Sequence, residues 1–271
     1  MNAPSKTEVE APYVLRSDAD GVATLTLNRG DRLNPLSTAM LAALQSELDR
    51  LAADSSIRAV IIAGAGNHFC AGHDLREMRA RAGESADKSW QSSLFEQCSR
   101  VMLTLIRLPQ PVIARVQGVA VAGGCQLVSM CDLAVAADVA RFALPGIASG
   151  IFCTTPGVGV ARNLARKHAL EMLFTGDQID AATAERWGLV NRVVPLAELD
   201  QAVTALARKV ASHSPAVVKL GKAFFYEQVE KGIADAYALA SEGMACNMML
   251  EDAAGGIDAF LAKRPPDWKN R

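Results

Sequence analysis

The sequence predicts an α/β fold over residues 1–199, followed by a helical region over residues 200–271. Up to about residue 195, short apolar or alternating segments typical of strands are separated by segments with apolar residues at helical spacing. Beyond that point only helical patterns remain. Two glycine-rich loops each connect a strand pattern to the start of a helix. These observations predict a mixed core and a set of C-terminal helices.

The first predicted elements alternate between strand and helix. Residues 22–28 (VATLTLN) alternate leucine with threonine, which indicates a half-buried strand. Ser37 is a candidate N-cap for an amphipathic helix whose apolar positions are Met40, Leu41, Leu44, Leu48 and Leu51. Residues 58–63 (RAVIIA) predict a buried strand, and a glycine-rich loop over 64–72 leads to a helix that starts near Asp74.

The same succession follows once more along the chain. Residues 111–116 predict a strand, 118–124 a glycine- and alanine-rich turn, 124–130 a short helix and 132–137 another strand. The C-terminal helices are predicted over residues 202–212, 215–229, 233–250 and 252–263.

Composition restricts the classes of function. The 271 residues suit one large domain, or a main domain with a modest appendage. The 28 Lys and Arg balance the 29 Asp and Glu, so no overall positive field favours nucleic acid or anionic lipid. Basic patches with interleaved aromatic residues are missing, and no segment reaches the roughly 18 apolar residues of a membrane span. We therefore expect neither nucleic acid nor a membrane as a partner.

Cysteine usage and the N-terminal segment predict the compartment. The six cysteines form no CxxC pair and have no nearby histidine at zinc-ligand spacing; they are Cys70, Cys98, Cys125, Cys131, Cys153 and Cys246. This pattern favours free thiols and no metal site. The first 13 residues lack the cationic start and apolar segment of a secretory signal. The sequence therefore predicts a soluble, cytoplasmic protein.

The two glycine-rich loops, FCAGHDL (69–75) and GVAVAGGCQL (118–127), are the segments where chemistry is expected. Helix N-termini carry unpaired backbone N–H groups, and small residues let a ligand oxygen approach them closely. Two such helix starts that converge would form an oxyanion hole. Alternatively, the glycines serve only tight turns and strand–helix packing.

Taken together, the loops and their flanking segments resemble the crotonase superfamily, the enoyl-CoA hydratase/isomerase family. The matching segments are LNRGDRLNPLS, RAVIIAGAGNHFCAGHDLREM, PVIARVQGVAVAGGCQLVSMCDLAVAA, ALEMLFTGDQIDAATAERWGLVNRVVP and GIDAFLAKRPPDW. The resemblance implies a spiral of β-β-α turns, a C-terminal helical trimerisation region and a homotrimer or dimer of trimers. It also implies an acyl-CoA thioester as ligand, no permanently bound cofactor, and lyase or isomerase chemistry in fatty acid metabolism.

The resemblance further implies particular binding residues. The backbone amides of Ala71 and Gly123 would hold the thioester oxygen, and Arg32 and Leu33 would lie beside the coenzyme A nucleotide. In an adjoining subunit, Phe260 and Lys263 would contact the adenine and phosphate region. The alternatives are a core position for Phe260, and ordinary solvated charges for Arg32 and Lys263.

Both catalytic glutamates of the family's hydratases are absent. Gln126 stands where the first is expected, and Gly146 where the second is expected. An amide does not exchange protons near neutral pH and glycine has no side chain, so neither residue can activate water. Because each general acid or base contributes roughly 10² to 10⁴ in rate, we expect ordinary hydration to be severely reduced.

The loop that follows is about three residues longer than is usual in the family. In GIFCTTPG (150–157), Cys153, Thr154 and Thr155 offer replacement polar groups, and His73 offers an imidazole near the thioester. The alternatives are a small buried Cys153 and a His73 that lies outside the site beside Asp74. GHDL, GGCQ and this loop together resemble one subgroup of the family in particular.

Three hypotheses follow from these residues. The first is an acyl-CoA enzyme that stabilises an oxyanion with backbone amides and uses atypical acid–base groups. The second is a catalytically silent acyl-CoA-binding or regulatory protein. In the third, another carboxylate replaces the glutamates, for which Asp74 and Asp132 are nearest, although Asp74 suits a helix cap and Asp132 a strand turn.

Overall fold

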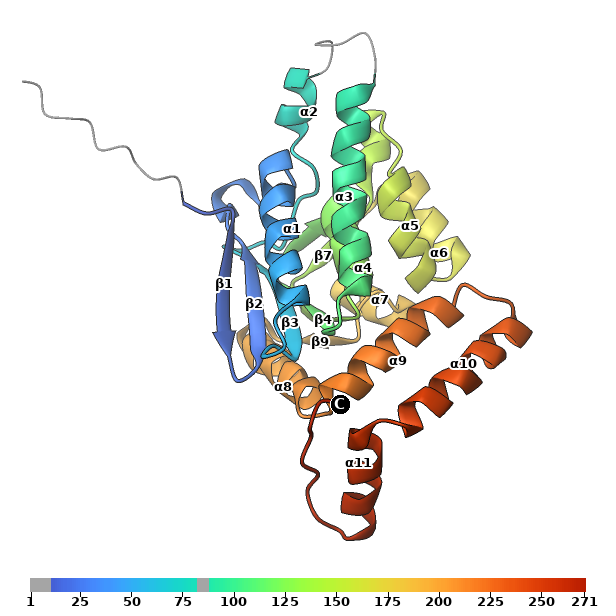
Figure 1. Ribbon diagram of the computed structural model, residues 1–271. Coiled ribbons are helices and arrows are strands. Elements are labelled where there is room, and N and C mark those ends of the chain that lie inside the picture. Colours follow the sequence, from blue (N-terminus) through green and yellow to red (C-terminus); the bar gives the residue numbers. More distant parts are fainter. Residues whose placement is uncertain (1–10, 82–87) are drawn as a thin grey trace, which may run out of the picture.

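The computed structural model describes residues 11–81 and 88–271 and confirms the α/β fold with C-terminal helices (Figure 1). The strands are β1 (Val14–Ala19), β2 (Val22–Leu27), β3 (Ala59–Gly64), β4 (Val112–Val116), β5 (Val119–Val121), β6 (Leu133–Ala137), β7 (Arg141–Ala143), β8 (Ile179–Asp180) and β9 (Arg192–Val194). The α-helices are α1 (Thr38–Ala52), α2 (Leu75–Arg81), α3 (Ser89–Arg107), α4 (Gly123–Met130), α5 (Thr154–Asn163), α6 (Arg166–Thr175), α7 (Ala181–Trp187), α8 (Leu199–Ala211), α9 (Pro215–Gln228), α10 (Ile233–Met248) and α11 (Glu251–Leu261). Short 3₁₀ helices span Gly30–Arg32, Pro145–Ser149 and Leu196–Glu198.

Two sheets give the fold its spiral form. The larger has the strand order β1-β2-β3-β4-β6-β9, and all its pairs except β1–β2 are parallel. The smaller has the order β5-β7-β8, and an isolated bridge between Cys70 and Ala120 extends it. Twice along the chain, one strand in the larger sheet is followed by one in the smaller sheet and then by a helix: β4 and β5 precede α4, and β6 and β7 precede α5. This arrangement is the predicted β-β-α spiral.

The larger sheet is covered on both faces, which explains its continuous apolar strands. Alternate residues of β3 point to opposite sides, so Val60 and Ile62 join the main core with α1 and α3, whereas Ile61 faces α8. Val203 and Ala207 of α8 complete that second cluster. The sequence predicted a separate helical region from residue 200 onward. Its first helix, α8, packs on the larger sheet. The division between residues 199 and 200 therefore stays a prediction.

The last two helices, α10 and α11, extend away from the body of the molecule, whereas α9 packs against it (Figure 1). They expose large apolar side chains to a degree unusual for a single chain, including Ile233, Tyr237, Met249, Phe260 and Leu261. None of the helices within residues 11–81 and 88–271 is long and apolar enough to cross a bilayer.

Local signals in the sequence account for most element boundaries. The Ser37 side chain accepts a hydrogen bond from the backbone N–H of Met40, which confirms the predicted cap of α1. All six cysteines are free thiols, as predicted. One expectation was wrong: the turn predicted over 118–124 contains β5, because residues 119–121 pair with β7.

Candidate active site

The two glycine-rich loops lie against each other. The backbone N–H groups of Phe69 and Cys70 both donate to the Val119 carbonyl oxygen, at 3.0 and 3.1 Å, and the Val121 N–H donates to Cys70 at 3.0 Å. At the start of α4, Gly124 sits so close that a Cβ on it would lie 2.1 Å from the Cys70 carbonyl oxygen. The two loops therefore form one packed unit.

The structure corrects the identity of one oxyanion donor. The Ala71 N–H donates to the Leu33 carbonyl oxygen at 2.9 Å, so it is occupied and cannot hold a thioester oxygen. The Gly72 N–H faces the Cys70 sulfur at 3.4 Å. By contrast, the N–H groups of His73 and Gly123 form no hydrogen bond with any described residue. The prediction for Ala71 is wrong, and the first free amide in this loop is that of His73.

The segments that carry these two free amides pack against each other. A Cβ on Gly72 would be 2.9 Å from the Gly123 nitrogen, and one on Gly123 would be 3.4 Å from Nδ1 of His73. Gly123 is the first residue of α4, where the helix dipole adds positive potential. Ala122 precedes it in a strained conformation, with φ 49° and ψ −118°, which turns the chain abruptly into the helix. The start of α4 and the first loop thus carry their free N–H groups in the same region of the molecule.

A largely apolar cavity of about 570 Å³ adjoins these amides. Its walls come from both loops, α2, α3, the 3₁₀ helix over 145–149 and the segment that starts α5. They are formed by Ala71, His73, Leu75, Met78, Phe95, Ala122, Pro145, Gly146, Ala148, Ser149, Ile151, Phe152, Cys153, Thr154, Thr155 and Pro156. His73 and Cys153 are the only titratable side chains among them. Among the described residues, no lining side chain is a carboxylate or a basic group of lysine or arginine.

His73 is held inside this cavity wall. Its ring packs edge-on against Phe95, with the ring centroids 5.4 Å apart. Its Nε2 atom is buried and has no hydrogen-bond partner. Burial lowers the pKa of His73 below the ordinary 6.5, although the Glu77 carboxylate acts in the opposite direction. The imidazole is therefore neutral at neutral pH.

The positions of the missing glutamates differ in their surroundings: Gln126 is buried, whereas Gly146 is half-buried and lines the cavity. Gln126 is 4% exposed, does not line the cavity, and places its Oε1 3.9 Å from the Cys98 sulfur. A Cβ on Gly146 would lie 2.3 Å from the Ile151 carbonyl oxygen and 2.8 Å from the Cys153 sulfur. The longer loop thus fills the space that a side chain at position 146 would need.

The same loop places Cys153 and Thr154 at the cavity. Cys153 is 6% exposed and burial raises the pKa of its thiol, so it behaves as a small buried group at neutral pH. Thr154 begins α5 and is exposed, with its hydroxyl 3.4 Å from the Phe152 carbonyl oxygen. Apolar residues of this loop, Ile151 and Phe152, also line the cavity, and sequence reasoning did not single them out.

Neither alternative carboxylate reaches the cavity. Asp74 accepts hydrogen bonds from the backbone N–H groups of Arg76 and Glu77, at 2.9 and 3.2 Å, and so caps α2. Asp132 binds the ammonium group of Lys222. Asp74 therefore caps the helix, as predicted, whereas Asp132 connects α9 to the start of β4 and does not merely fix a turn.

The residues predicted for coenzyme A lie in two separate places. Leu33 pairs with the first loop through its carbonyl oxygen, and Arg32 is exposed beside Asp31. Phe260 is 81% exposed and, with Lys263, lies at the far end of α11, remote from the loops (Figure 1). One chain therefore does not bring Phe260 and Lys263 to its own cavity.

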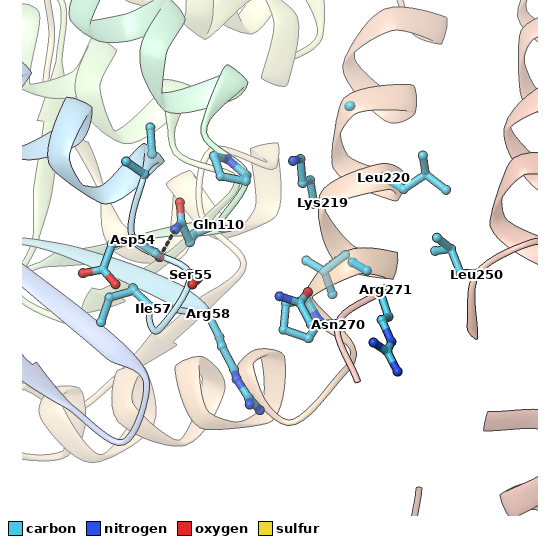
Figure 2. A pocket seen from close by; sticks show the side chains of 17 residues that line it. Asp54, Ser55, Ile57, Arg58, Gln110, Lys219, Leu220, Leu250, Asn270 and Arg271 are labelled. Carbon is cyan, nitrogen blue, oxygen red and sulfur yellow. Dashed lines mark hydrogen bonds between the residues drawn. The ribbon is translucent and has the colours of Figure 1, made fainter. Parts of the chain in front are cut away.

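A second cavity, of about 530 Å³, lies elsewhere in the molecule and contains none of the predicted site residues. Figure 2 shows Lys219 and Leu220 of α9 across from Arg58 and the segment around Asp54. The Gln110 side chain there donates a hydrogen bond to the Asp54 carbonyl oxygen at 3.1 Å. In the described part of the chain, no cluster of His, Cys, Asp or Glu is arranged to hold a metal ion.

Comparison with known proteins agrees with this class of fold and site. The sequence profile of the enoyl-CoA hydratase/isomerase family matches residues 17–271, so the chain belongs to that family. It is 45% identical to human enoyl-CoA hydratase domain-containing protein 3, mitochondrial, over 93% of this chain and 82% of that protein. It is 35% identical to 2,3-dehydroadipyl-CoA hydratase of Escherichia coli, over 92% of this chain and 96% of that protein.

Solved structures show the same relationship. An enoyl-CoA hydratase from Mycobacterium smegmatis superposes with a TM-score of 0.91 at 51% identity, covering 95% of this chain and 99% of that one. The human domain-containing protein 3 gives a TM-score of 0.90 at 44% identity, covering 94% and 100%. These matches confirm the crotonase fold and the subgroup that GHDL, GGCQ and the longer loop indicate.

The predicted location was wrong. Relatives from rat, human and mouse, at 42%, 45% and 41% identity, are mitochondrial proteins by name, which contradicts the cytoplasmic expectation. Free thiols and neutral charge do not distinguish the two compartments, so the composition carried no information on this point.

Proposed function

We propose that the protein is an acyl-CoA-processing enzyme that binds the thioester oxygen to the backbone amides of His73 and Gly123. The observation that carries this proposal is the pair of free, adjacent N–H groups beside an apolar cavity. Donors fixed in place by the fold stabilise the negative charge of an enolate or related oxyanion, and one such donor is typically worth about 3 kcal/mol. Coenzyme A enters only as part of the substrate.

The chemistry we propose is of the lyase or isomerase type and does not use paired carboxylates. Water addition across a double bond requires groups that deprotonate water and protonate carbon. Gln126 supplies neither, and the packing around Gly146 leaves no room for a side chain. A catalytically silent acyl-CoA-binding protein is the second candidate, which the loss of both carboxylates favours. Measured turnover of an acyl-CoA separates the two.

We further propose that the chain assembles as a homotrimer or dimer of trimers, with Arg32 and Leu33 of one subunit and Phe260 and Lys263 of the next at the coenzyme A nucleotide. Exposed apolar side chains of the kind found on α10 and α11 usually mark a protein interface. In addition, α11 lies far from the acyl cavity of the same chain (Figure 1). Sedimentation velocity should give three or six chains of 28.7 kDa. A monomer at micromolar concentration contradicts this proposal.

Binding to the two amides can be tested without altering the protein. In an S-alkyl coenzyme A, a methylene group replaces the carbonyl group of the acyl thioester. Two N–H groups then remain unpaired, so we expect the thioether to bind about 10- to 100-fold more weakly than the thioester of equal chain length. Isothermal titration calorimetry with hexanoyl-CoA and S-hexyl-CoA measures this ratio. Equal affinities would show that the amides do not contact the carbonyl oxygen.

A further inference from the structure

Residues 251–271, the C-terminal hairpin, fold back on themselves. After α11 the chain turns along that helix and returns to the corner between α8 and α9 (Figure 1). The Trp268 ring rests on α11, where a Cβ on Gly256 would lie 3.1 Å from it, and its indole N–H donates to the Ser212 carbonyl oxygen at 2.8 Å. The tip of the C-terminal hairpin, where α11 ends and the tail begins, carries Phe260 and Lys263.

Asp252 fastens the two ends of the C-terminal hairpin together. Its carboxylate accepts hydrogen bonds from the Lys269 N–H at 2.5 Å, from the Asn270 N–H at 3.0 Å and from the Ser214 hydroxyl at 2.5 Å. The Asp252 N–H donates to the Arg271 carbonyl oxygen at 3.0 Å. Because Asp252 is only 2% exposed, these bonds lie within protein. One side chain therefore joins the first turn of α11, the end of the tail and the residue that caps α9.

Apolar packing contributes little to holding the C-terminal hairpin in place. Neither apolar core cluster includes a described residue beyond Ala211, and the buried residues of α11 are Asp252 and Ala259. Buried hydrogen bonds require one geometry, because a donor or acceptor left without its partner costs free energy. Asp252 and Trp268 therefore fix the direction in which the C-terminal hairpin extends.

The backbone at the tip is unfavourable for the residue that occupies it. Lys263 has a φ of 52°, in the left-handed region that favours glycine, and it follows Ala262, the C-cap residue of α11. A lysine in this conformation costs free energy relative to glycine. Packing does not explain the choice, because Lys263 is exposed. A requirement for an ammonium group at the tip does explain it.

We propose, resting on the function proposed above, that Asp252 and Trp268 are positioning residues for the coenzyme A nucleotide of the adjoining subunit. They act through the tip of the C-terminal hairpin. By fixing its direction, they hold the exposed Phe260 ring where it can cover the adenine and the Lys263 ammonium where it can pair with a phosphate. No residue of the C-terminal hairpin lines the acyl cavity, so nucleotide binding and acyl binding should be separable.

A ligand without the nucleotide distinguishes positioning from general stability. S-hexanoyl-pantetheine carries the same acyl thioester as hexanoyl-CoA and lacks the nucleotide with its phosphates. In Asp252→Ala, isothermal titration calorimetry should show hexanoyl-CoA binding about 10- to 100-fold more weakly, as for one lost hydrogen bond to a charged group. Binding of the pantetheine ester should stay unchanged. The matched control Asp258→Ala removes an exposed carboxylate from the same helix and should bind both ligands like the wild type.

Further variants test the tail and the tip. Trp268→Ala should give the same selective loss, and Trp268→Phe, which keeps a ring beside Gly256, should restore most of it. Lys263→Gly should weaken hexanoyl-CoA binding and yet raise the midpoint of urea unfolding, because glycine removes the backbone cost. Adding Lys263→Gly to Asp252→Ala should weaken binding little further, since the first change has already displaced the ammonium group.

The outcomes separate this proposal from the function on which it rests. If neither hexanoyl-CoA nor its pantetheine analogue binds to the wild type, the proposed function fails. If both bind to the wild type with equal affinity, the acyl site stands and the positioning proposal is overturned. Equal loss of both ligands in Asp252→Ala, or no loss of either, also overturns it, and loss of hexanoyl-CoA binding alone supports it. Should Asp252→Ala not fold, the same comparison in Trp268→Ala decides.

Discussion

Replacing Gly124 by alanine is expected to reduce acyl-CoA turnover by about 10²-fold, because a misplacement of about 1 Å can have an effect of that size. A Cβ at this position would lie 2.1 Å from the carbonyl oxygen of Cys70 and 2.8 Å from its carbonyl carbon. Both atoms are backbone, so no side-chain rotation relieves the clash. The start of α4 must move away from the first loop, which separates the amides of Gly123 and His73.

The matched control is Gly221→Ala in α9, another glycine within a helix. Nothing lies within 4 Å of a Cβ there, and alanine is favoured over glycine by about 1 kcal/mol in a helix interior. We expect Gly221→Ala to keep wild-type turnover, whereas Gly124→Ala also loses about 1–3 kcal/mol of stability through overpacking. Acyl-CoA turnover and urea unfolding measure the two effects. Wild-type turnover in Gly124→Ala would show that close packing of the loops does not position the donors.

The regular elements that the sequence predicted correctly have local signals. Alternation in residues 22–28 and the cap at Ser37 depend only on near neighbours, and both elements form as expected. β5 was missed because its three residues gain strand geometry only by pairing with β7. The small residues that flank β5, Gly118 before it and Ala122 after it, made this segment resemble a turn.

The candidate site shows where sequence reasoning stops. The order of the motifs was enough to locate both loops. It could not show which amide is free, because that depends on residues 30–36, which lie alongside the first loop. Leu33 takes the Ala71 N–H, and Leu36 donates its own N–H to Gly72, so the first free amide is that of His73. Likewise, the absence of a glutamate at Gly146 was evident, but not that Ile151 and Cys153 occupy its space.

The largest effect on stability is expected for Asp132→Ala. The Asp132 carboxylate accepts hydrogen bonds from the Val112 N–H at 2.6 Å, from Lys222 Nζ at 2.6 Å and from the Tyr226 hydroxyl at 2.8 Å. The Asp132 side chain thereby connects the start of β4 to α9. The Lys222 side chain is only 7% exposed, and its ammonium also donates to the carbonyl oxygens of Leu105 and Gln110.

Removing the carboxylate leaves a buried cation without its counter-charge, which typically costs about 3–5 kcal/mol. Urea unfolding at pH 7 measures this loss against that of Asp200→Ala. The Asp200 side chain is 79% exposed, so its ion pair with Arg115 should contribute at most about 1 kcal/mol. Adding Lys222→Met to Asp132→Ala should recover much of the loss, because an apolar pair needs no charge compensation.

The pH dependence of Asp132→Ala follows from the same charge. Burial lowers the pKa of Lys222 below 10.5, while Asp132 opposes this shift, so removing Asp132 lowers that pKa further. Between the pKa values of Lys222 in the folded and unfolded chains, the unfolded chain binds more protons than the folded chain. The free energy of unfolding therefore rises with pH in this range. The deficit of Asp132→Ala should therefore be largest at and below neutral pH and shrink as pH rises toward 10.5. A deficit that stays constant over this range would show that the loss comes from packing and not from the stranded ammonium group.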